Sequence, residues 1–184
     1  MAIAPTLVHR RPTHGSARLD THDTASRRDL RLIGYWDDDP RGRWIMPAFL
    51  VDPTWTRDER ERLASYLDGG TLLSGYLGYA RCRLSSAIPD TAMGNAERTD
   101  GTWVWPEGLS LYVREFGVRV PRELDEHAER AGLVAPTPDR ASLNLERFDL
   151  TFWETWCEGH KQRVGWLRYA ATSVWRTRRL RRRS

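Results

Sequence analysis

Apolar residues recur along the chain in short blocks that predict strands and helices between residues 30 and 175. Two apolar runs, at 30–36 and 44–51, are separated by a turn-like polar segment, and we expect each run to be extended. Pro47 restricts the second run to an edge strand at best. Residues 71–86 carry glycines among aromatic residues, which favours a bent extended segment over a helix.

Helix signals first appear after residue 55. Thr56 followed three residues later by Glu59 is a capping-box pattern, and it predicts a helix that extends to Asp68. A second helix is predicted to follow Pro106, because apolar residues then recur at i, i+3, i+4 and i+7 until Gly117 ends the pattern.

Two more helices are predicted in the second half of the chain. The first covers residues 121–132, and the two prolines in residues 133–144 then indicate a linker loop. Residues 148–175 show apolar positions at steps of three and four, which predicts an amphipathic helix, bent or broken at Gly159 and Gly165. This helix either docks its apolar face on the core or lies at a membrane interface. The apolar face includes Trp153, Trp156 and His160.

Aromatic residues decide which fold class the composition allows. Leu, Ile, Val and Phe make up only 37 of the 184 residues, a level at which a charged chain is often disordered. Nine Trp and six Tyr offset this shortage, because their large rings can build a core from few residues. We therefore predict a small aromatic-rich single domain of the α+β class at residues 31–175, with short strands and three to four helices.

Basic charge is concentrated at the two ends of the chain. The net charge is +4, but residues 32–175 hold 17 basic and 22 acidic side chains and are therefore acidic. We predict a disordered basic leader at residues 1–30 and a basic tail at residues 176–184. Such ends attract polyanions without reading a nucleic-acid sequence. The tail arginines are Arg176, Arg178, Arg179, Arg181, Arg182 and Arg183.

The sequence shows no membrane or targeting segment. No stretch approaches the ~20 apolar residues that a bilayer span requires, and the apolar start of the chain is too short for a signal peptide. Cys82 and Cys157 are the only cysteines, too few for a disulfide framework. We therefore expect a cytoplasmic protein with no transmembrane segment.

Candidate catalytic and metal-binding groups are few. The motifs that carry a known mechanism, such as the P-loop, are absent, which lowers the expectation of an enzyme without excluding one. Cys82, His127, Cys157 and His160 form a weak candidate zinc set, since the last two are spaced for one helical turn. The leading interpretation is buried cysteines and ordinary histidines. The acidic run at 37–39 is interpreted as a solvated turn rather than a cation site. We predict no bound metal and no cofactor.

One stretch of the chain carries an unusual motif. T-D-G-T-W-V-W-P-E-G-L occupies residues 99–109, and G-Y-L-G-Y-A-R-C-R-L precedes it at residues 75–84. Together they resemble the pattern of an uncharacterised family of small bacterial proteins, C-R-F-C followed by T-D-G-x-W-x-W-P-E-G-L-x-H-Y-V-x-x-H-x-V-x-L-P. The resemblance implies a zinc-like set of two cysteines and two histidines, here degenerate and replaced by apolar packing. Of the four positions this chain retains Cys82, and the others are Ser85, Leu111 and Phe116.

The same stretch indicates where a partner could bind. Asp100 and Gly101 predict a turn, and residues 103–105 predict a strand that leads into the helix after Pro106. This joint either has a purely structural role or leaves a partly open aromatic groove. The groove would be formed by Tyr76, Tyr79, Trp103 and Trp105.

Three functions from different classes are compatible with these patterns. The leading hypothesis is a non-enzymatic binding or accessory protein that docks another protein through an aromatic surface, while its Arg-rich ends attract polyanions non-specifically. The first alternative is a small enzyme or ligand-binding protein with a pocket near Cys82, Asp100 and Glu107. The second alternative is a non-specific nucleic-acid-binding accessory, whose affinity would fall steeply with salt.

Overall fold

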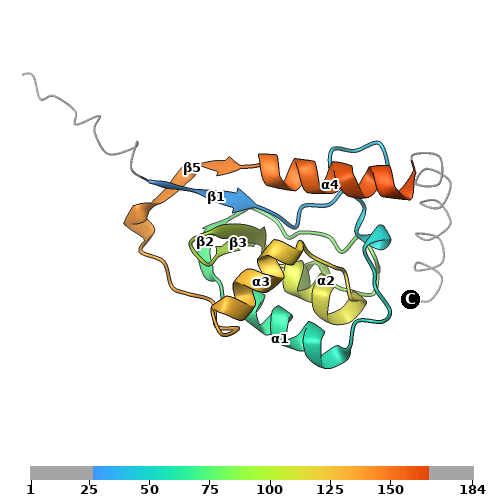
Figure 1. Cartoon of the computed structure of the whole chain (residues 1–184), viewed down its shortest axis with the longest axis horizontal. Coiled ribbons are helices and arrows are strands. Elements are labelled where there is room, and N and C mark those ends of the chain that lie inside the picture. Colours follow the sequence, from blue (N-terminus) through green and yellow to red (C-terminus); the bar gives the residue numbers. More distant parts are fainter. Residues whose placement is uncertain (1–26, 166–184) are drawn as a thin grey trace, which may run out of the picture.

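A five-stranded mixed sheet organises residues 27–165, the part of the chain that the computed structural model describes (Figure 1). The strands are β1 (Arg28–Leu32), β2 (Thr71–Gly75), β3 (Ala96–Thr99), β4 (Trp103–Pro106) and β5 (Leu143–Asp149). Their order in the sheet is β2-β3-β4-β1-β5. The three strands β2, β3 and β4 are antiparallel neighbours, whereas β1 runs parallel to both β4 and β5. The first strand of the described residues therefore lies inside the sheet.

Within residues 27–165, four α-helices accompany the sheet: α1 (Arg57–Asp68), α2 (Leu109–Phe116), α3 (Arg122–Arg130) and α4 (Thr151–Val164). The first three are grouped on one side of the molecule, and α4 lies on the opposite side next to β1 (Figure 1). Large rings fill the core between them, each at most 3% exposed: Trp36, Tyr66, Trp103, Trp105, Tyr112 and Trp153. The protein is therefore a small single domain of the α+β class with an aromatic core, as the composition predicts.

Local sequence signals place the helices α1 to α3 correctly. The predicted capping box at α1 is present: the Glu59 N–H donates to the Thr56 hydroxyl (3.3 Å), and the Thr56 N–H donates to the Glu59 carboxylate (3.0 Å). Gly117 ends α2 with a φ of 63°, the left-handed conformation that favours glycine. Pro121 immediately precedes α3, as expected of a residue with no N–H to place in the helix.

One predicted extended segment is largely wrong, and a second contains a shorter strand than its length suggests. The run at 44–51 contains a short 3₁₀ helix, Pro47–Phe49, and only Val51 forms a single bridge, to Val118. A proline favours such a tight turn because it cannot donate to a strand ladder. In residues 71–86 only the first five residues form a strand, β2.

The second half of the described chain departs further from the prediction. The expected linker at 133–144 ends in β5, which pairs in parallel with β1, and α4 begins at Thr151 rather than at residue 148. Gly159 does not break α4, whereas Gly165 ends it with a φ of 68°. The part of this predicted helix beyond residue 165 lies outside the described residues.

The start of the sheet lies before the predicted domain boundary at residue 31. β1 begins at Arg28, and Leu30 is completely buried. Residues 28–30 therefore belong to the sheet rather than to a leader. The rest of the predicted leader, up to residue 26, and the predicted tail at 176–184 lie outside the described residues.

Candidate functional site

One wall of the candidate site comes from α4. Where the helix begins, the Asp149 carboxylate accepts a hydrogen bond from the Thr151 N–H (2.9 Å). Residues three and four positions apart share one face of a helix, and here that face includes Trp153 and Cys157, both completely buried. The Trp153 Nε1–H donates to the Tyr35 carbonyl oxygen (3.0 Å). The described part of this helix therefore docks its apolar face on the core.

Aromatic rings form a continuous series from the core to the surface along α4. Trp36 meets Trp153 edge-on with ring centroids 5.1 Å apart, and Trp153 stacks on Trp156 at 4.9 Å with 12° between the planes. Trp156 in turn contacts His160 at 3.9 Å. Since Trp156 and His160 are partly exposed, the series ends in aromatic ring edges at the surface.

His160 is held as a neutral ring. Its Nδ1 lies 2.8 Å from the Trp156 carbonyl oxygen, and because a carbonyl only accepts, Nδ1 carries the proton. One Arg163 guanidinium nitrogen lies 2.9 Å from both ring nitrogens and therefore covers the ring, where the unprotonated Nε2 is the one that can accept from it. Burial lowers the pKa of His160 below its usual value, and the positive charge of Arg163 acts in the same direction. At neutral pH Arg163 is therefore the cation on this wall.

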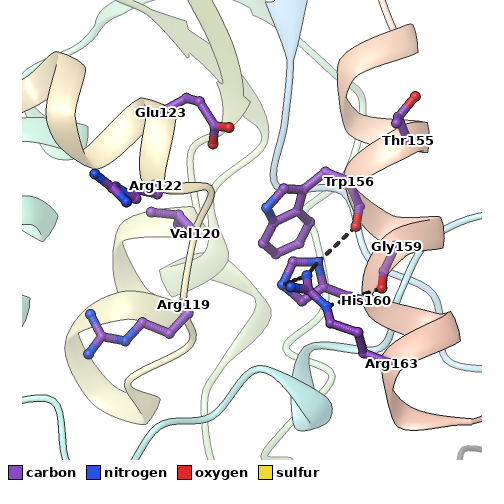
Figure 2. A pocket seen from close by; sticks show the side chains of 9 residues that line it. All are labelled: Arg119, Val120, Arg122, Glu123, Thr155, Trp156, Gly159, His160 and Arg163. Carbon is purple, nitrogen blue, oxygen red and sulfur yellow. Dashed lines mark hydrogen bonds between the residues drawn. The ribbon is translucent and has the colours of Figure 1, made fainter.

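The facing wall is the segment that leads into α3. The Arg119 guanidinium pairs with Asp52 (2.9 Å) and lies over the Trp55 ring, 4.0 Å from its centroid. Arg122 pairs with Glu126 one helical turn later (2.5 Å). Figure 2 shows both arginine side chains directed away from α4. The positive charge of this wall is thus matched by carboxylates outside the cleft.

The space between the two walls is an open cleft of about 710 Å³. Val120 belongs to the lining together with Trp156 and His160, and the carboxylate of Glu123 extends toward the gap (Figure 2). Gly159 leaves the α4 wall flat, because nothing lies within 4 Å of the position that its Cβ would take. The lining consists of Arg119, Val120, Arg122, Glu123, Thr155, Trp156, Gly159, His160 and Arg163.

The lining offers binding groups rather than a catalytic set. Its one hydroxyl, on Thr155, donates to a carbonyl oxygen one helical turn earlier (2.8 Å), and the His160 nitrogens are hydrogen-bonded within α4. No nucleophile in the lining is paired with a general base. The arrangement instead suits an apolar group resting on Trp156, with Arg163 and Glu123 available to opposite charges.

The predicted groove of four aromatic residues is not formed. Trp103 and Trp105 are 2% and 0% exposed, since Trp103 packs against α4 and the Trp105 Nε1–H donates to the Leu67 carbonyl oxygen of α1 (3.2 Å). Tyr76 and Tyr79 are 54% and 55% exposed in the loop after β2. This loop is a second exposed aromatic surface, separate from the cleft residues.

Asp100 does not belong to the pocket predicted near Cys82, Asp100 and Glu107, although a small cavity does lie beside the other two, lined by their chain neighbours Arg81, Arg83, Pro106 and Gly108. Asp100 precedes β4 and Glu107 follows it, so roughly 13 Å of strand separates them. Asp100 is buried and accepts from the Tyr66 hydroxyl (2.7 Å), while Glu107 pairs with Arg98 (2.6 Å). Both carboxylates therefore have structural partners at opposite ends of the hairpin.

The four residues considered for zinc do not come together. Within residues 27–165, no three His, Cys, Asp or Glu side chains are arranged to hold a metal ion. Cys82 is a buried thiol in the loop before β3, and burial raises the pKa of Cys157 to about 12. His127 on α3 lies 3.2 Å from the Asp100 carboxylate, and His160 belongs to the aromatic series.

The three carboxylates of residues 37–39 bind groups of the protein in and around the local turn. The Asp37 carboxylate accepts from the Trp44 N–H (2.5 Å), and Asp39 accepts from the N–H two residues later (2.7 Å). Asp38 pairs with Arg81. Each carboxylate thus has a partner from the protein itself.

The sequence pattern identified only half of the cleft. Trp156 and His160 were assigned to one apolar face of a docked helix, but the turn of α4 leaves them at the edge of that face. The facing segment 119–123 carries no local signal of a site, because its position depends on how α3 packs. Gly159, a glycine in the middle of a helix, is the one signal that could have indicated an open surface.

Comparison of the chain with protein-family models, with curated proteins and with solved structures finds no match in any of the three. The resemblance to a small bacterial family therefore stays a prediction. Two of the positions that it assigns to lost ligands, Leu111 and Phe116, are partly buried against the core. Among the described residues no helix has the length and apolar character needed to cross a bilayer.

Proposed function

We propose that the protein is a non-enzymatic binding protein that docks a segment of another protein into the cleft between α3 and α4. An apolar side chain of the partner rests on Trp156 and His160. Arg163 on one wall and Glu123 on the other complement charges that flank this anchor.

The observation that carries the proposal is the open position at Gly159. Alanine would favour the helix by about 1 kcal/mol over glycine, and its Cβ would meet no neighbour. The fold therefore gains nothing from a glycine at this position. With no side chain at residue 159, a partner can reach the exposed edges of Trp156 and His160 between the two helices (Figure 2).

The charges of the cleft favour a protein segment over a nucleic acid. Glu123 extends toward the gap and would repel phosphates, while Arg119 and Arg122 are paired outside it. Residues 27–165 hold 19 basic and 23 acidic side chains, a net charge of −4. A body of this charge does not attract a polyanion over its whole surface.

The Arg-rich tail has a separate role in the proposal. The six tail arginines lie outside the described residues, and they attract polyanions without selecting a sequence. Replacing all six by glutamine should lower the salt concentration at which the protein elutes from heparin. The same variant should leave docking at the cleft unchanged.

Variants at Gly159 test the cleft directly. Gly159→Gln places a long neutral side chain into the open space, and Gly159→Ala is the matched control with the smallest side chain. Tyr79→Gln removes an exposed ring from the loop after β2, the other aromatic surface. Full-length tagged variants are incubated with cell extract, with and without nuclease treatment, and the retained proteins are compared by quantitative mass spectrometry.

We expect a protein that the wild type, Gly159→Ala and Tyr79→Gln retain and that Gly159→Gln loses. Binding that survives Gly159→Gln but disappears with Tyr79→Gln would move the docking surface to the loop after β2 and overturn the proposal. Loss of every retained protein on nuclease treatment would favour the nucleic-acid-binding alternative.

A further inference from the structure

A smaller cavity of about 170 Å³ lies apart from the cleft, between the segment after β1, the loop before β3 and the start of α2. Most of its lining is apolar, with Met93 and Leu109 on the walls. The residues on either side of Cys82, Arg81 and Arg83, contribute its charged part. A closed apolar cavity of about 150 Å³ is large enough to hold benzene.

Two of the residues that line this cavity carry a buried hydrogen-bond donor with no acceptor. The Trp36 Nε1–H and the Arg83 Nε–H are two of five buried side-chain nitrogen or oxygen atoms in the described residues that make no hydrogen bond. Trp36 is 3% exposed, so its N–H is well removed from bulk water. Both groups can only donate, and leaving them unmatched is unfavourable. A ligand that satisfies them must bring acceptor oxygens.

The charges around the cavity point to an anion. Arg81 and Arg83 share a single carboxylate, Asp38, and the Arg83 Nε lies 3.5 Å from it without a hydrogen bond. These two guanidinium groups therefore outnumber the carboxylate that they share by one charge. The Tyr112 hydroxyl accepts from the Arg83 backbone N–H (2.8 Å), and burial raises its pKa to about 12, so it keeps a proton to donate. Tyr35, also in the lining, directs its hydroxyl to Glu97.

We propose that this cavity binds a small monocarboxylate whose apolar body is about the size of one aromatic ring. The carboxylate accepts from Trp36 and Arg83, and the apolar body packs against Met93 and Leu109. This site is independent of the docking cleft, since the two share no lining residue.

Benzoate is the probe. Two control ligands test separately whether its negative charge and its aromatic ring are needed for binding. Benzyl alcohol keeps the ring without the charge, and acetate keeps the charge without the ring. Titration calorimetry and saturation-transfer NMR on the full-length protein should show benzoate bound at least about tenfold more tightly than either. Acetate binding as tightly as benzoate would indicate a surface arginine contact, and equally tight benzyl alcohol would show that the donors are not used. Either result overturns the proposal.

Two variants test the donors, and one tests the location. Trp36→Phe keeps an aromatic ring but removes the N–H, and Arg83→Lys keeps the charge but removes Nε; each should weaken benzoate binding about tenfold. Arg163→Lys, in the cleft, should leave it unchanged. Because Trp36 lies in the core, circular dichroism melting first checks that its variant is folded, and Arg83→Lys provides the independent test. Benzoate affinity that neither donor variant changes, or no benzoate binding at millimolar concentration, would refute the site.

Discussion

The glycine in the middle of α4 should be replaceable with a gain in stability. Gly159 is the ninth of the 14 residues of α4, and no atom lies within 4 Å of the position of an added Cβ. Its backbone is not in the left-handed region. Alanine at this position removes the backbone entropy cost of glycine in a helix, so Gly159→Ala should stabilise the protein by about 1 kcal/mol. For a protein of this size, that corresponds to a rise in melting temperature of about 2–4 °C.

Gly132 provides the matched control, because its Cβ position is equally open but its φ is +67°. An L-residue in this conformation is strained, so Gly132→Ala should lower the free energy of unfolding by about 1–2 kcal/mol. Urea unfolding followed by far-UV circular dichroism measures both changes at constant m-value. A Gly159→Ala variant less stable than wild type would refute the reasoning, because it would mean that the fold itself requires this glycine.

Three further predictions concern groups described above. The pKa of His160 is lower in the folded protein than in the unfolded chain, so as the pH falls from 7 to 5 the unfolded chain takes up a proton at this residue more readily. The wild type should therefore lose stability over this range relative to His160→Gln. Urea midpoints of the two proteins that fall by the same amount would contradict this. The buried Cys157 thiol, with its pKa near 12, should not react with a disulfide reagent at pH 8 until the protein is unfolded; rapid labelling of native protein would show that α4 opens readily. Thr56→Ala removes the capping box and should cost about 1 kcal/mol in thermal unfolding, whereas an unchanged melting temperature would argue against the cap.

Signals that act within a few residues were enough to place α1, α2 and α3. The capping box at Thr56, the left-handed Gly117 and the proline before α3 each fix a helix end by a bond or a dihedral angle in the same segment. Such features do not depend on the rest of the fold. The same locality explains why the turn at Asp100 was predicted correctly: its carboxylate accepts from the backbone N–H groups of the next residues, including Trp103 (2.7 Å).

Elements that depend on distant partners were not predictable in this way. β5 is stabilised by pairing with β1, which lies more than 100 residues earlier, and its own sequence carries little alternation. The sequence pattern of Trp103 and Trp105 predicts a strand, and it is the same whether their rings are exposed to solvent or buried under a helix. α4 and α1 cover them, and no feature near these tryptophans indicates that packing. The cleft was missed for the same reason, since its two walls meet only through the tertiary fold.

The interior position of β1 has a consequence for synthesis on the ribosome. Arg28–Leu32 leaves the exit tunnel early, yet its neighbours β4 and β5 end only at Pro106 and Asp149. Until then the nascent chain carries a strand with one or both edges unpaired, the state most exposed to association with other chains. β1 carries three charged residues, Arg28, Asp29 and Arg31, and such charges disfavour pairing of an open strand edge with other chains. Completion of the sheet therefore has to wait for β5, which is synthesised more than 100 residues after β1.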